Sequence, residues 1–129
     1  MTETSKERRA HPRFAIQGAT VSYLIHGPEV REPDFPISYP LMELSRGGMS
    51  FITESALKAE SALSIFLSGL RIEETLRMTG RVVYCRASGI KPSRYCIGVE
   101  FRPFAKKRGC NTPESLEILK RLEKGYLQA

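Results

Sequence analysis

Hydrophobic and polar residues alternate through most of the middle of the chain, which is the pattern of half-buried β-strands. Residues 19–25 (ATVSYLI) place apolar side chains at every second position and predict a first strand, which we expect to begin near Phe14. No stretch between the later runs is long enough for a parallel crossover helix, so the pattern predicts an all-β antiparallel barrel or sandwich. Five further runs read as strands: 37–44, 48–53, 61–68, 76–86 and 94–101.

Proline and glycine interrupt this pattern at a few positions. The segment 26–36 contains three prolines and several charges, so we expect a loop there. Pro40 lies within the second run and favours an edge or a bulge at that point. Gly80 and Gly98 are candidate bends, where a small barrel turns its corners, although ordinary turn chemistry explains them equally well.

The last part of the chain has a different period. Thr112 can cap a helix, Pro113 suits its first position and Glu114 favours the positive end of the helix dipole. The apolar face of this helix should pack on the barrel or on a partner, and we expect the barrel, because a small core gains from an added apolar layer. That face recurs every three or four residues and consists of Leu116, Ile118, Leu119, Leu122 and Tyr126.

Length and composition describe an ordinary soluble domain. The chain has 129 residues, of which 41% are hydrophobic and 26% charged, and this fits one domain. No apolar run is long enough to cross a membrane, and the first ten residues lack the apolar core of a secretory signal, so we expect a cytoplasmic protein. The three cysteines are odd in number and form no CxxC spacing, which predicts neither a disulfide framework nor a zinc site.

The chain carries a formal charge of +6 at pH 7, which favours an anionic partner such as a nucleic acid, a nucleotide or an acidic protein. The basic residues are scattered from Lys6 to Lys124 and are not interleaved with aromatic residues, so general nucleic-acid binding is the weaker interpretation. His11 and His26 have no acid, thiol or metal partner at a recognisable spacing. We therefore predict neither catalysis nor a metal site.

The stretch ERRAHPRF contains three arginines within eight residues, Arg8, Arg9 and Arg13. Pro12 disfavours a regular helix at this point, so the arginines should lie on an extended or turning arm. A guanidinium donates two parallel hydrogen bonds to phosphate and can stack on a purine. Taken alone, the stretch is either a solvated tail or an arm that holds an anion.

A second polar stretch, MELSRGGMSF, joins the second and third predicted strands. Gly47 and Gly48 permit a positive φ and a close approach of the backbone to a ligand. Ser45 offers a hydroxyl, and the carboxylate of Glu43 can accept hydrogen bonds from ring N–H groups. Taken alone, this stretch is equally explained as a plain hairpin with a Gly-Gly turn.

Together, in this order and with a later pattern GxVVY…YxIGVxF, the two stretches resemble the PilZ domain family. The resemblance covers about residues 7–104. The family signature RxxxR is matched from Arg9 to Arg13, with Arg8 before it as is common in the family. A second signature, Asp or Asn followed by xSxxG, is matched at Ser45 and Gly48, whereas Glu43 occupies its first position.

The resemblance implies a six-stranded antiparallel PilZ-type β-barrel, with the C-terminal α-helix added, and the ligand cyclic di-GMP without any cofactor. It divides the chain into a flexible tail (1–7), a barrel domain with the arginine arm (8–104), and a linker with the helix (105–129). Tyr84 occupies a position that is often aromatic in the family, where it would stack on a base or simply pack on the barrel wall. The implied ligand-binding residues are Arg8, Arg9, Arg13, Glu43, Ser45, Gly48 and Tyr84.

The resemblance leaves two functions open. In the first, the chain is a bacterial receptor whose arm closes over cyclic di-GMP and thereby changes the interaction with a downstream protein partner. In the second, it is an adaptor that no longer binds nucleotide, because Glu43 is one methylene longer than the usual residue. A buried donor left without a partner by this change costs about 1–3 kcal/mol, or roughly ten- to a hundredfold in affinity.

Overall fold

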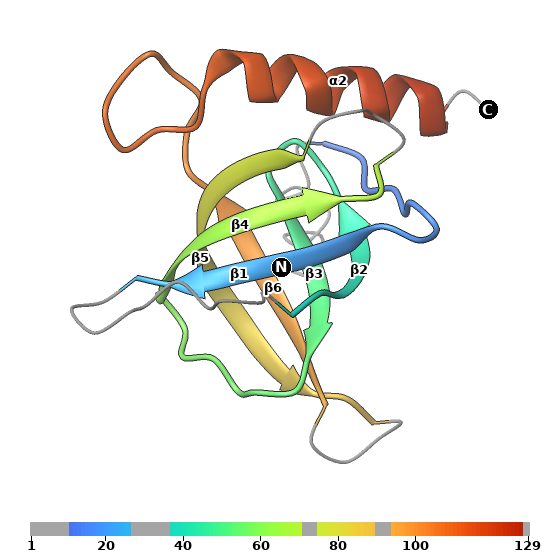
Figure 1. Cartoon of the computed structure of the whole chain (residues 1–129), viewed down its shortest axis with the longest axis vertical. Helices are drawn as coiled ribbons and strands as arrows, with labels where there is room; N and C mark the ends of the chain where they lie inside the picture. Colours follow the sequence, from blue (N-terminus) through green and yellow to red (C-terminus); the bar gives the residue numbers. More distant parts are fainter. Residues whose placement is uncertain (1–10, 27–36, 71–74, 90–93, 128–129) are drawn as a thin grey trace, which may run out of the picture.

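A computed structural model of the chain describes residues 11–26, 37–70, 75–89 and 94–127. In these residues, six antiparallel strands form a closed barrel in the order β1-β2-β3-β6-β5-β4, and one helix follows them (Figure 1). The predicted all-β barrel with a C-terminal helix is thus confirmed. The elements are β1 (Thr20–Ile25), β2 (Tyr39–Leu44), β3 (Gly48–Thr53), β4 (Ala62–Ser68), β5 (Leu76–Ala87), β6 (Tyr95–Phe101) and α2 (Pro113–Leu127).

The first strand is shorter than the sequence predicted. Phe14 makes only an isolated bridge with Leu44, and β1 begins at Thr20. Between them the chain turns at Gly18, whose φ of 85° lies in the left-handed region that favours glycine. A turn of this kind interrupts the extended backbone, which is why Phe14 and β1 belong to separate segments.

The barrel is closed most weakly between β1 and β2. These strands pair at two positions, Thr20 with Pro40 and Val21 with Tyr39. By contrast, β1 and β4 pair at six positions. Pro40 has no N–H to give to a ladder. The register between β2 and β3 then shifts between Leu41 and Glu43, so the predicted irregularity lies close to Pro40 and directly before Glu43.

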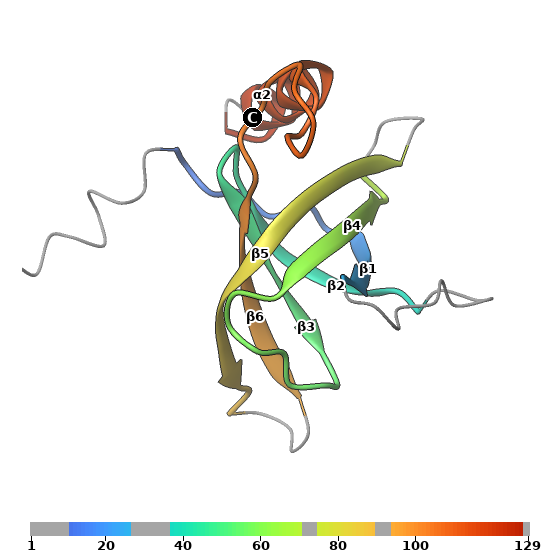
Figure 2. The same ribbon diagram turned by 90° about the vertical axis from the view of Figure 1, so that its left-hand side faces the viewer.

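One hydrophobic core fills the barrel and extends to α2. Leu119 and Leu122 of α2 are buried in the same cluster as the inward-facing residues of the strands. The helix lies across one end of the barrel, where Figure 2 shows it end-on. The predicted packing of the helix on the barrel is therefore confirmed.

The start of α2 is fastened to β5. The Ser115 N–H donates to Oγ1 of Thr112 at 3.1 Å, which confirms Thr112 as the N-cap. Before it, the buried side chain of Asn111 accepts from the Thr79 N–H at 2.7 Å and donates to the Arg102 carbonyl at 2.9 Å. These bonds fix where the helix begins relative to the sheet.

The three cysteines are free. Among the residues that the structure describes, no group of His, Cys, Asp and Glu could hold a metal ion. The described helix is also too short and too polar to span a bilayer.

Candidate functional site

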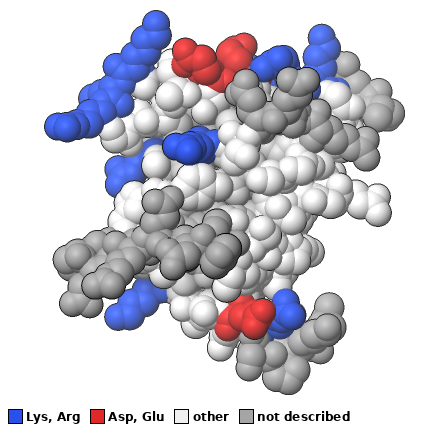
Figure 3. Space-filling view, in the orientation of Figure 1, with Lys and Arg blue, Asp and Glu red and all other residues white. Residues whose placement is uncertain are grey.

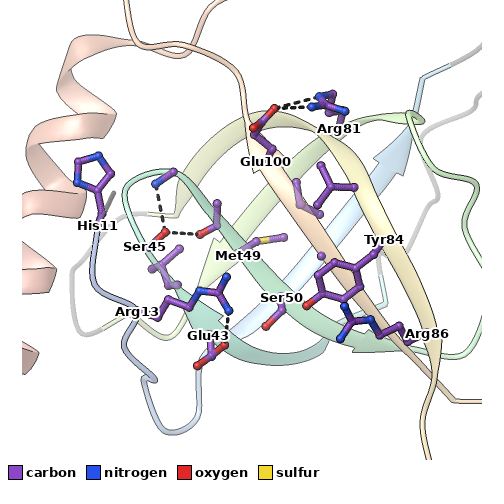
Figure 4. A pocket seen from close by; sticks show the side chains of 16 residues that line it. His11, Arg13, Glu43, Ser45, Met49, Ser50, Arg81, Tyr84, Arg86 and Glu100 are labelled. Carbon is purple, nitrogen blue, oxygen red and sulfur yellow. Dashed lines mark hydrogen bonds and ion pairs between the residues drawn. The ribbon is translucent and has the colours of Figure 1, made fainter. Parts of the chain in front are cut away.

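A cavity of about 730 Å³ opens on the barrel surface between the arm, the β2–β3 turn and strands β5 and β6 (Figure 4). Its lining includes Arg13, Glu43, Ser45, Gly48 and Tyr84. The structure thus brings together all the implied ligand-binding residues that it describes. Arg8 and Arg9 lie outside the described residues.

The turn between β2 and β3 is held by its own serine. The Ser45 N–H donates to the Gly48 carbonyl at 2.9 Å, and the Gly47 N–H donates to Oγ of Ser45 at 3.2 Å. Neither glycine has a positive φ, which differs from the freedom that the sequence suggested. A Cβ on Gly48 would lie 2.1 Å from the Val99 carbonyl oxygen, so this glycine is needed for close packing of β3 on β6.

The arm is anchored immediately after Arg13. Phe14 exchanges two backbone hydrogen bonds with Leu44, at 2.9 and 2.8 Å, and its ring is buried. This anchor places Nη1 of Arg13 3.5 Å from Oε1 of Glu43, at the edge of the cavity (Figure 4). Both side chains are nearly half exposed, so their ion pair is weak and water can compete for either group.

Tyr84 lies flat on the opposite wall of the cavity, over Gly98. A Cβ on Gly98 would be 2.0 Å from a ring carbon of Tyr84, so only glycine leaves room for this ring. Sequence reasoning treated Gly98 as a candidate bend; in the structure it is the seat of an aromatic side chain. Burial raises the pKa of the Tyr84 phenol, and the contact with Cys96 raises it further.

Two arginines of the cavity were missed from the sequence. The guanidinium of Arg86 lies 4.3 Å from the centre of the Tyr84 ring. The two residues are two positions apart on β5 and so share one face of the strand, which is the sequence signal that could have placed Arg86 beside Tyr84. Arg81 is held at the far rim by Glu60 and Glu100, with N–O distances of 2.6 and 2.8 Å. Hydrogen bonding to Glu100 is the main reason that the pKa of Arg81 is raised.

Exposed basic residues outnumber exposed acidic ones at the end of the barrel that carries α2. Figure 3 shows Lys and Arg side chains over α2 and the loop before it, with Asp and Glu side chains among them. This end of the barrel also carries the arm and the β2–β3 turn, so the field on that side favours an anionic ligand. The exposed basic residues of this end are Arg102, Lys106, Lys107, Arg108, Lys120, Arg121 and Lys124.

Comparison with protein families matches residues 7–108 to the PilZ domain. The match covers most of the chain, which therefore belongs to the PilZ domain family. None of the curated proteins compared with the chain matches its sequence.

Solved structures of similar fold include one PilZ domain and two further bacterial proteins. The PilZ domain of Escherichia coli YcgR with c-di-GMP has a TM-score of 0.63 at 13% identity, with 94% of this chain and 92% of that chain covered. Bacillus subtilis MotI/DgrA, an inhibitor of motility, has a TM-score of 0.62 at 15% identity, covering 94% of this chain and 52% of that chain. The K. pneumonia MrkH–c-di-GMP complex has a TM-score of 0.57 at 17% identity, covering 91% and 50%. The chain thus spans about half the length of MotI/DgrA and MrkH, and the likeness concerns the fold.

Proposed function

We propose that the chain is a cyclic di-GMP receptor module that acts by binding and without catalysis. The observation that carries the proposal is the convergence of Arg13, Glu43, Ser45, Gly48 and Tyr84 on one cavity, although these residues come from three separate segments. The cavity volume, about 730 Å³, lies in the range of ordinary small-molecule sites. Membership of the PilZ family and the c-di-GMP complexes of YcgR and MrkH support the choice of ligand.

The chemistry of the lining suits a cyclic dinucleotide. Such a ligand carries two phosphate anions and two guanines. Arg13, with Arg8 and Arg9 on the same arm, supplies guanidinium groups for the phosphates and for stacking on guanine. Tyr84 offers an aromatic face on the other wall.

Glu43 has a role both before and after ligand binding in this proposal. In the empty site its carboxylate is the partner of Arg13, at 3.5 Å. An exposed pair of this kind contributes only about 0.2–1 kcal/mol, so a phosphate can take Arg13 at little cost. The released carboxylate then accepts hydrogen bonds from the N1–H and amino group of a guanine, while Ser45 stays in the turn.

Closure of the arm is the proposed signal. Residues that become ordered over the ligand lose conformational entropy, so the ligand must gain contacts that exist only in the closed state. The altered position of the arm then changes the interaction with a downstream protein partner. In this proposal, closure of the arm takes place within one domain and needs no cofactor.

Calorimetric titration with cyclic di-GMP tests the proposal. We expect the native chain to bind in the micromolar range or tighter, and GMP at the same concentrations to give little heat, because it cannot bridge the arm and Tyr84. Arg77→Ala is a matched control, since Arg77 is exposed, lies outside the cavity lining and is not one of the basic residues at the end of the barrel that carries the arm. Absence of binding by the native chain would overturn the receptor proposal and leave the nucleotide-free adaptor.

A further inference from the structure

Arg46 lies in the turn between β2 and β3 (residues 45–48), which carries the second PilZ motif and is called the motif turn below. Its side chain does not line the cavity. Its Nε donates to Oε1 of Glu123 at 3.1 Å and its Nη2 to Oε2 at 2.6 Å, which is a two-bond contact across 77 residues. Within residues 43–50, Arg46 is the one residue that does not line the cavity. The Glu123 side chain is 12% exposed and that of Arg46 is 31% exposed, so both are shielded more than the pair at the arm. The motif turn is thus tied to α2.

The arm is tied to the same face of α2. The ring of Phe14 stacks on that of Tyr126, with centroids 5.8 Å apart and planes 15° from parallel. Phe14 directly follows Arg13 in the sequence, and Tyr126 is three residues after Glu123, so the two side chains share one side of the helix. One turn of α2 therefore contacts both segments that carry the PilZ motifs.

We infer that Glu123 and Tyr126 of α2 are positioning residues of the ligand site, and that occupancy of the cavity is coupled through them to how firmly α2 is held on the barrel. A two-bond contact between a guanidinium and a carboxylate fixes orientation as well as distance. Loss of either partner leaves a shielded charge without its counterpart. The coupling to ligand rests on the proposed function, whereas the positioning does not.

Coupling must act in both directions. If α2 stabilises the arrangement of turn and arm that binds ligand, then ligand bound to that arrangement stabilises α2 to the same extent. A masking role predicts the opposite sign: if Glu123 merely withheld Arg46 from the ligand, loss of its carboxylate would free a cation beside an anionic ligand and strengthen binding. The two roles are therefore separated by the direction of one affinity change.

The positioning is tested first without ligand, by hydrogen exchange of the full chain. In Glu123→Gln we expect faster exchange at the amides of residues 45–48 as well as in α2. Glu117→Gln is the matched control, because Glu117 is exposed, pairs with Lys120 at 3.4 Å and acts on Arg46 only through a charge interaction weaker than that of Glu123. Faster exchange confined to α2 would show that Glu123 merely stabilises the helix, and would overturn the positioning.

The coupling is tested by repeating the exchange and calorimetry with cyclic di-GMP. We expect ligand to slow exchange in α2 of the native chain, and Glu123→Gln to weaken binding by about fivefold or more, the lower end of usual coupling between sites. The double variant Arg46→Gln, Glu123→Gln should bind no more weakly than either single variant. Each single substitution already removes the same contact, the one between Arg46 and Glu123.

The outcomes separate this inference from the proposed function. If the native chain binds cyclic di-GMP but Glu123→Gln binds within about twofold of it, or more tightly, the coupling is wrong and the receptor function stands. If the native chain does not bind, the receptor function and the ligand coupling fail together. Exchange at residues 45–48 of the ligand-free Glu123→Gln variant then still decides the positioning.

Discussion

Four arginines lie in or beside the cavity within the described part of the chain, and they form two contrasting pairs. Arg46 and Arg81 each hold a carboxylate at 2.6 Å, from Glu123 and Glu60 respectively. In both cases hydrogen bonds from the guanidinium to a carboxylate raise its pKa above the ordinary value. These two guanidinium groups already have close, hydrogen-bonded anionic partners.

Arg13 and Arg86 are held loosely by comparison. Arg13 reaches one carboxylate, that of Glu43, and only at 3.5 Å, whereas the equally exposed Arg81 contacts two carboxylates at 2.6 and 2.8 Å. Arg86 is exposed and rests on the face of Tyr84. A phosphate can bind these guanidinium groups without displacing a well-placed carboxylate, which is the difference that matters for an anion site. The number of arginines around the cavity is thus a poorer guide to its ligand than their present partners.

Removal of the Arg13 guanidinium should change ligand affinity more than any other substitution proposed for the cavity. Arg13→Ala should weaken cyclic di-GMP binding at least about thirtyfold, because truncating one partner of a desolvated charge pair costs about 2 kcal/mol or more. Arg81→Ala is the matched control and should change the affinity less than about threefold, since its guanidinium already serves Glu60 and Glu100. Calorimetry measures both. Equal losses in the two variants would show that the partners of an arginine do not decide its availability.

Gly98→Ala tests the platform on which Arg86 rests. The added Cβ would overlap the Tyr84 ring, and we expect a loss of about 1–3 kcal/mol in the free energy of unfolding, as for other overpacked sites. Gly89→Ala is the control, since a Cβ there meets nothing within 4 Å. Adding Tyr84→Ala to Gly98→Ala should recover part of the loss. Urea unfolding measures these differences, and an unchanged stability in Gly98→Ala would mean that the ring moves freely.

The fold could be predicted from local patterns. Short apolar runs between turn residues, two of them with clear alternation, identified all six strands, because each strand buries one face in a single core. The cap at Thr112 and the apolar face after it located α2 for similarly local reasons. The start of β1 was misplaced at Phe14, because an isolated bridge and a strand residue leave the same apolar signal.

The candidate site was only partly predictable. The two motifs gave Arg13, Glu43, Ser45 and Gly48, and the structure brings them to one cavity. The partner of Arg46 could not be predicted, because Glu123 lies 77 residues away and the pairing depends on how α2 crosses the barrel. Motif residues alone therefore do not separate an arginine that faces the cavity from one that holds α2 on the barrel.

Glu43→Asp tests the loosely held Arg13–Glu43 pair from the carboxylate side. The shorter side chain matches the residue type usual at this position of the signature, and it should lose its contact with Arg13. We expect binding to strengthen by up to about tenfold, the value of one additional well-made hydrogen bond to a charged group. Glu54→Asp, at an exposed position outside the cavity lining, controls for a general effect of shortening an acid. Weaker binding in Glu43→Asp would show that the longer carboxylate suits the ligand.

Removal of Arg86 should have a weaker effect, a shift in the pKa of Tyr84. Burial is the main reason that this pKa lies above its ordinary value of 10.0, and the Arg86 guanidinium lowers it. Because the fold favours the neutral phenol, its contribution to stability is complete below the unfolded pKa and is lost as pH rises through the folded pKa. Arg86→Ala should therefore shift the titration of Tyr84 to still higher pH.

Ultraviolet absorbance titration measures this shift, with Tyr84→Phe variants subtracted to remove the signals of the other tyrosines. Arg81→Ala is again the control and should leave the titration of Tyr84 in place, because Arg81 is not among the groups that shift it. A shift to lower pH in Arg86→Ala would mean that Arg86 acts mainly by covering the phenol. In that case Arg86, like Arg46, would belong to the scaffold, and Arg13 would be the single available guanidinium among the four.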